Sequence, residues 1–196
     1  MRTTSALLSA AGLCLALYVI ARPWAQGDSP DAWAATSWPV SHAMAMLGFV
    51  LLAAAAQRIA VVHPTPGLRP LAWASVGLLL PYYGAEAFGL HALATVGAGN
   101  AADVAESIRW GAIQAVAFVI GWAALAALGI QLAVALSRDV SDRAQRVASW
   151  SLAVGLTAYF PVFFLPPGGR VAHGLLVAAA ALATAWRLPR WSPACA

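Results

Sequence analysis

Long apolar runs, separated by short polar or proline- and glycine-rich connectors, make up most of this chain. Most runs are close to the length of about 20 residues that an α-helix needs to cross a bilayer. The pattern predicts an all-α fold, a polytopic transmembrane helix bundle that forms a single membrane domain over residues 1–196. The six predicted spans are residues 5–22, 41–62, 71–93, 106–136, 147–165 and 170–187.

The beginning of the chain has two interpretations. Arg2 and the apolar run after it fit a first transmembrane helix, but they also fit a cleaved signal peptide. Cleavage after Ala25 would put Pro23 at the −3 position, where a small residue is needed. We therefore expect the first span to be retained. The tryptophan-rich stretch 23–40 is expected to lie along the membrane surface, because tryptophan favours the headgroup level.

Two helix boundaries follow from local signals. Ser41 is a plausible N-cap for the second span, since its hydroxyl can accept a backbone N–H. The run 103–136 would be about 50 Å long as one helix, at about 1.5 Å per residue. Because the hydrocarbon core is only about 30 Å thick, we expect the first turns to project as an acidic, amphipathic extension. Pro81 is expected to kink the third span, and Pro161 the fifth.

The composition excludes a soluble domain. The chain is 62% hydrophobic and 9% charged, with a mean hydropathy of +0.76, whereas soluble proteins carry about 25% charged residues. The pI near 9.7 does not indicate nucleic-acid binding, because no basic stripe or recognition motif accompanies it. The two cysteines, Cys14 and Cys195, form neither a ligand cluster nor a disulfide framework.

The basic residues, all arginine, predict the orientation. Six spans place eight arginines on one side of the membrane and three on the other, namely Arg22, Arg109 and Arg170. Because positive charge accumulates on the cytoplasmic side, we expect both termini to be cytoplasmic and the protein to be a multi-pass component of the cytoplasmic (inner) membrane. Arg170 is expected to contact lipid phosphates.

Most of the polar chemistry then falls in the outer half of the bilayer. Three of the four histidines, one arginine (Arg109) and Glu86, the only carboxylate in the interior of a span, share this depth. Ionisable groups at membrane depth are costly and indicate a site. Two tyrosines, Tyr82 and Tyr83, lie next to Glu86 in the sequence. The predicted site is therefore an outer-leaflet pocket.

The first hypothesis for this pocket is cofactor or metal binding. Two histidines on different helices can ligate b-type haem, and an arginine can pair with a propionate. The residues assigned to such a cofactor are His42, His173, Arg109, Tyr82 and Tyr83. A transition metal is the alternative, with His42, His91 and His173 as its ligands.

Two further hypotheses stand beside it. The protein could be an enzyme in which Glu86, kept protonated by apolar surroundings, is the general acid acting on a lipid or isoprenoid substrate. Glu86 could instead pair with Arg109, in which case its role is structural. Third, the chain could be an accessory subunit whose abundant small residues pack against another membrane protein or a second copy. No phosphate loop, nucleophile elbow or His-Glu-x-x-His motif is present in the sequence.

Overall fold

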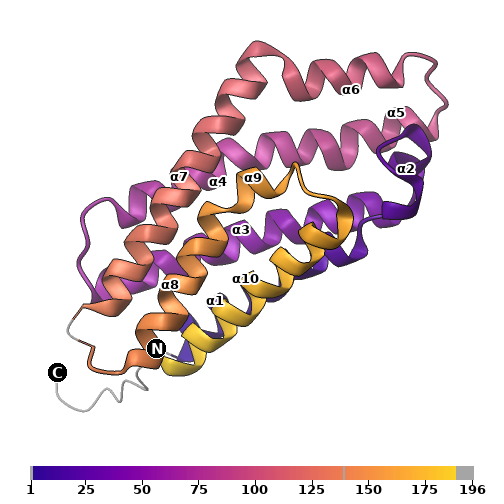
Figure 1. The fold of residues 1–196 in the computed structure, drawn as a ribbon. Coiled ribbons are helices and arrows are strands. Elements are labelled where there is room, and N and C mark those ends of the chain that lie inside the picture. The colour runs from indigo at the N-terminus through magenta and orange to yellow at the C-terminus, as the bar shows by residue number, and fades with distance from the viewer. Residues whose placement is uncertain (1, 139, 189–196) are drawn as a thin grey trace.

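The structure, a computed structural model, describes residues 2–138 and 140–188, and every regular element within these ranges is a helix. Four of the helices are long and apolar enough to cross a membrane (Figure 1). They are α1 (Arg2–Ala21), α3 (Ser37–Val62), α7 (Ala112–Ser137) and α10 (Pro167–Arg187). The all-helical fold predicted from the sequence is therefore confirmed, and these four helices indicate a membrane protein.

Two more helical stretches accompany these four. One runs without interruption through α4 (Leu68–Gly84), the π-helical turn η2 (Ala85–Leu90) and α5 (His91–Thr95). The other consists of α8 (Arg143–Thr157) and α9 (Tyr159–Val162). They coincide with the predicted third and fifth spans. The remaining elements are short: η1 (Trp24–Gln26), α2 (Pro30–Ala34) and α6 (Ala101–Trp110).

The long helices form a closed ring. Each packs against the next in the order α1, α3, α4, α7, α8 and α10, and α10 returns to α1. Figure 1 shows α2, α5 and α6 gathered at one end of this bundle. We call this the pocket end. The opposite end carries the connector 63–67 and the beginning of α8.

Small residues allow the helices of the ring to approach closely. A Cβ added at Gly12 of α1 would lie 2.5 Å from the Cβ of Ala181 and 3.2 Å from the Cα of Ala178, both on α10. A Cβ added at Gly174 of α10 would lie 2.3 Å from Val19 of α1. Contact through glycine and alanine is typical of helices packed in lipid. Helix α1 thus contributes to the core.

The predicted fourth span is wrong in one respect, because it is not a single helix. Helix α6 ends at Trp110 and α7 begins at Ala112, with Gly111 between them in an extended conformation (φ −54°, ψ 139°). A Cβ at Gly111 would lie 2.8 Å from the carbonyl oxygen of Ser107. Glycine therefore permits a sharp change of direction here, and Arg109 lies on a separate helix rather than on an extension of α7.

Other boundaries also differ from the sequence expectation. Helix α3 begins at Ser37, so Ser41 is inside the helix, where its hydroxyl donates to the carbonyl oxygen of Trp38 rather than capping. The fifth stretch begins at Arg143, where the side chain of Asp142 accepts the backbone N–H of Ala144, and breaks at Ala158. Proline cannot donate to the carbonyl four residues earlier, so Pro161 accounts for this break.

The third stretch is irregular one turn after Pro81. Helix α4 continues through the proline and then widens into the π-helical turn that holds Glu86. Such turns are rare and occur frequently at functional sites. The irregularity places Glu86 at the pocket end, with its side chain turned into the bundle.

Candidate functional site

An arginine held between two carboxylates lies at the centre of the pocket end. Arg109 of α6 donates from Nε to Glu86 Oε1 at 2.5 Å and from Nη2 to Glu86 Oε2 at 3.1 Å. The same guanidinium donates to both carboxylate oxygens of Asp28, at 2.7 and 3.1 Å. Paired N–H···O contacts of this kind are the strongest hydrogen bonds between side chains. The cluster joins three segments that are distant in the sequence.

The arginine and the carboxylates of this cluster stabilise one another's ionised forms. Burial opposes ionisation of Asp28, but the hydrogen bonds from Arg109 and Trp33 outweigh burial and lower the pKa of its carboxyl group. Burial likewise opposes the charged form of Arg109, while the bonds and charges of Glu86 and Asp28 raise the pKa of its guanidinium above the ordinary value. The Arg109 side chain is 15% exposed and that of Glu86 only 5%.

A second set of bonds fixes the backbone around Glu86. The indole of Trp38 donates to the carbonyl oxygen of Glu86 at 2.7 Å. His42, one turn further along α3, uses Nδ1 to donate to the carbonyl oxygen of Trp38 at 2.8 Å. Its other nitrogen, Nε2, lies 4.0 Å from Glu86 Oε2. His42 and Glu86, which the sequence analysis assigned to one site, therefore do lie together.

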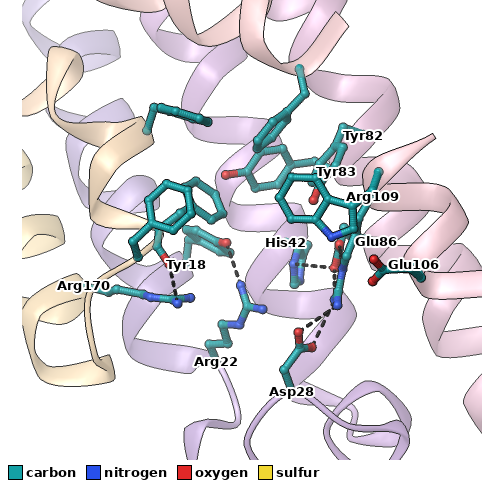
Figure 2. A pocket seen from close by; sticks show the side chains of 15 residues that line it. Tyr18, Arg22, Asp28, His42, Tyr82, Tyr83, Glu86, Glu106, Arg109 and Arg170 are labelled. Atoms are coloured by element: carbon teal, nitrogen blue, oxygen red, sulfur yellow. Dashed lines mark hydrogen bonds and ion pairs between the residues drawn. The ribbon is translucent and has the colours of Figure 1, made fainter. Parts of the chain in front are cut away.

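Asp28, His42, Glu86 and Arg109 border a cavity of about 350 Å³. Figure 2 shows charged side chains on one side of it, which we call the charged floor. The members of the floor are Arg22, Asp28, Glu86, Arg109 and Arg170. Four phenylalanines whose rings contact one another also line the cavity, and we call them the aromatic wall: Phe118, Phe160, Phe163 and Phe164. The lining of the cavity thus combines charged side chains with a cluster of apolar rings.

Several of these residues were not predicted. Tyr18, Arg22, Asp28, Arg170 and the four phenylalanines of the wall line the cavity without having been assigned to it. Their depth was available from the sequence, since the orientation analysis placed all three arginines on the same side. Their convergence was not, because it depends on the order of helices in the ring.

The tyrosines of the predicted pocket do line it. Tyr82 stacks on Phe118 with ring centroids 4.0 Å apart, and Tyr83 contacts the rings of Tyr18 and His42. Tyr83 is fully buried, and its hydroxyl has no hydrogen-bond partner among the described residues. A buried hydroxyl without a partner is uncommon.

The other two predicted histidines do not join the pocket. His91 donates from Nδ1 to the carbonyl oxygen of Trp33 at 2.7 Å, and His173 donates from Nε2 to that of Gly155 at 2.8 Å. Each ring is thus bound to backbone. Within residues 2–138 and 140–188, no group of three or more histidine, cysteine, aspartate or glutamate side chains could hold a metal ion. The predicted His42, His91 and His173 metal site is not formed.

The geometry does not support haem between His42 and His173 either. His42 borders the large cavity, whereas His173 borders a separate cavity of about 20 Å³, little more than the space for a water molecule. Tyrosine rings occupy the surroundings of both imidazoles: Tyr18 lies against His42 and Tyr159 against His173. The two histidines thus border different cavities, and an aromatic ring packs against each imidazole.

The ion pair between Glu86 and Arg109 argues against the hypothesis that Glu86 is a general acid. A general acid must begin the reaction with a proton to give. Both oxygens of Glu86 instead accept N–H donors from Arg109, which is the arrangement of a carboxylate without its proton. Of the two roles the sequence left open, pairing with Arg109 is the one present. Because Nδ1 of His42 donates to Trp38, Nε2 is the ring nitrogen that remains for another partner.

Comparison of the chain with protein-family models, curated proteins and solved structures finds no match in any of the three. The functional interpretation therefore depends on the geometry of the pocket.

Proposed function

We propose that this chain is an integral membrane protein that binds an amphiphilic ligand in the cavity between the charged floor and the aromatic wall. The observation that supports this is that one cavity is lined both by charged side chains and by a cluster of phenylalanine rings. A ligand with a polar head and a hydrocarbon part satisfies both surfaces at once. A purely polar ligand would leave the phenylalanines in contact with water.

The rim of the cavity indicates how such a ligand enters. Two aromatic residues that border the cavity are largely exposed, Phe164 at 72% and Trp110 at 62%. Exposed aromatic side chains on a membrane protein face lipid or the interface. The ligand therefore enters from the outer part of the bilayer. This proposal keeps the predicted pocket and replaces haem or metal by an amphiphile.

The proposed function includes a membrane topology with six crossings. The closed ring of helical stretches supports six crossings of the cytoplasmic membrane. The arginines at the end opposite the pocket, among them Arg58, Arg69 and Arg143, support cytoplasmic termini. The pocket would then face the outer leaflet.

The test is the amount of amphiphile bound to purified protein, measured by native mass spectrometry and by analysis of extracted lipids. Phe164→Ala shortens the aromatic wall, and we expect about a tenfold loss of bound amphiphile, the effect of losing part of one buried phenyl contact. Phe88→Ala is the matched control, because Phe88 is 60% exposed and does not border the cavity.

Two results would contradict the proposal. Wild-type protein that binds no amphiphile from native membranes would remove it, and the accessory-subunit hypothesis would take its place. If Phe88→Ala and Phe164→Ala lost equal amounts of bound amphiphile, the bound lipid would belong to the general surface of the bundle.

A further inference from the structure

The charged floor contains two arginines without counter-ions. Arg109 is neutralised by Glu86 and Asp28. Within the part of the chain that the structure describes, neither Arg22 nor Arg170 forms an ion pair with a carboxylate. Both are only partly exposed and both border the cavity. Partly buried charge without a partner is unfavourable.

Both side chains are nevertheless held in place. Arg22 donates from Nη1 to the hydroxyl of Tyr18 at 2.9 Å. Arg170 donates from Nε to the carbonyl oxygen of Leu165 at 2.8 Å and from Nη2 to that of Phe163 at 2.5 Å. A guanidinium has five N–H donors. Most donors of Arg22 and several of Arg170 therefore remain available to a ligand.

The two guanidinium groups converge although their charges are alike. Both lie against the ring of Trp24, with Cζ 5.1 Å from the ring centroid for Arg22 and 5.2 Å for Arg170. They are close enough for the charge of Arg22 to act on Arg170. Figure 2 shows Arg170 directed towards Arg22 across the cavity. An anion bound between the two guanidinium groups would offset the repulsion between these like charges.

The charge of Asp28 acts on both Arg22 and Arg170, but the carboxylates that border the pocket form no ion pair with either arginine among the described residues. Glu86 and Asp28 are occupied by Arg109. Glu106, exposed at the rim, lies beyond Arg109 on the side away from Arg22 and Arg170 (Figure 2). The cavity is thus divided into a saturated cluster at Arg109 and an unsaturated, positive part at Arg22 and Arg170.

We propose that Arg22 and Arg170 together bind the phosphate group of an amphiphile whose hydrocarbon part lies against the aromatic wall. Two arginine forks suit a tetrahedral phosphate better than a carboxylate, because one fork already satisfies the two oxygens of a carboxylate. The inference deepens the proposed function and rests on it: it assigns the chemistry of the head group and the residues that recognise it.

The test compares four probes with protein in phosphatidylcholine nanodiscs, by calorimetry and by the shift of the thermal unfolding midpoint. The probes are dodecyl phosphate, dodecanol, dodecyltrimethylammonium and inorganic phosphate. We expect dodecyl phosphate to bind at least tenfold more tightly than the neutral and cationic amphiphiles, and inorganic phosphate to bind weakly, because it has no hydrocarbon part. A bound ligand raises the unfolding midpoint.

Substitutions connect this preference to the two arginines. R22Q and R170Q should each weaken dodecyl phosphate binding about tenfold, the usual effect of losing a charge-assisted hydrogen bond, and leave dodecanol binding unchanged. R58Q is the matched control, since Arg58 is an exposed arginine at the opposite end of α3. If either glutamine variant fails to fold, R22K and R170K keep the charge without the fork and should weaken binding several-fold.

The outcomes separate the inference from the function on which it rests. Equal affinity for dodecanol and dodecyl phosphate, unaffected by R22Q and R170Q, would overturn the phosphate site and leave an amphiphile pocket. Arginine-dependent binding of inorganic phosphate as tight as that of dodecyl phosphate would support the anion site with a free phosphate as its source and contradict the amphiphile. No binding of any amphiphile would remove both proposals.

Discussion

Arg109 connects two carboxylates that approach it from different parts of the chain. Its contact with Glu86 is almost fully buried, whereas that with Asp28 is half exposed. Removing one member of a buried pair leaves an uncompensated charge, which costs far more than the intact pair contributes. The Glu86–Arg109 contact should therefore limit the stability of the pocket end.

A double-mutant cycle measures this contact. We expect Arg109→Gln to lower the free energy of unfolding by about 3–5 kcal/mol, because the Glu86 carboxylate is then buried without a partner. The double variant Arg109→Gln/Glu86→Gln should lose much less free energy of unfolding than the two single variants lose together. Unfolding in mixed detergent micelles gives the values. Arg187→Gln, which breaks an exposed pair with Asp142, is the control and should have no measurable effect. Additive losses at positions 86 and 109 would contradict the coupling.

The other half of the cluster predicts a pH dependence. The pKa of Asp28 is lower in the folded protein than its unfolded value of about 3.9. Its stabilising contribution is therefore fully present above that value and is lost as the pH falls through the lower, folded pKa. Between neutral pH and pH 3, stability should fall less in Asp28→Asn than in wild type, as measured by denaturant unfolding at each pH. Parallel profiles for the two proteins would show that this carboxylate is not linked to folding.

At the scale of elements, the contact between α1 and α10 depends on the absence of side chains. Gly12 and Gly174 occupy positions where a Cβ would overlap the facing helix. In lipid, helix association comes from close packing rather than from exclusion of water. Separation of α1 from α10 would also displace Tyr18 and Arg22 from the cavity, since both lie at the end of α1.

This packing can be tested with a matched pair of glycines. Gly12→Ala should cost about 1–3 kcal/mol through overpacking, since its Cβ meets Ala181 and the backbone of Ala178. Gly77→Ala on α4 should cause no loss, because a Cβ there meets nothing within 4 Å. Thermal unfolding in detergent compares the two variants. Similar midpoints would show that α1 and α10 do not pack as closely as the structure indicates.

At the scale of the whole molecule, the ring brings the ends of all its helices to one of two surfaces. The connectors at the pocket end hold Asp28 and Arg109, and the opposite end holds most of the arginines. An excess of positive charge on one side of the membrane orients membrane proteins. The two surfaces should therefore differ in their access to reagents outside the cell.

Cysteine labelling tests this topology in a background without native cysteines (Cys14→Ser, Cys195→Ser). A membrane-impermeant maleimide applied to intact cells should label Ser29→Cys and Gly99→Cys and should not label Thr65→Cys or Ser141→Cys. The opposite pattern would reverse the orientation. Labelling of only one of the two pocket-end positions would show that the number of crossings between them is wrong.

The sequence determined the helical stretches and the depth of each polar residue, because apolar length and connector composition act locally along the chain. Glu86, His42 and Arg109 were therefore assigned to a common depth without any structure. Local signals failed where a single glycine changes the path, as at Gly111, whose extended backbone separates α6 from α7.

Only the tertiary structure decided which of these residues meet. Helix order is set by packing between small side chains on different segments, such as Gly12 and Ala181, and no pattern within one segment encodes that order. The ring places α1 between α3 and α10, which separates His42 from His173 and brings Arg22 towards Arg170. The predicted histidine site was lost and an arginine site formed for the same physical reason: side chains at equal depth interact only when their helices are neighbours.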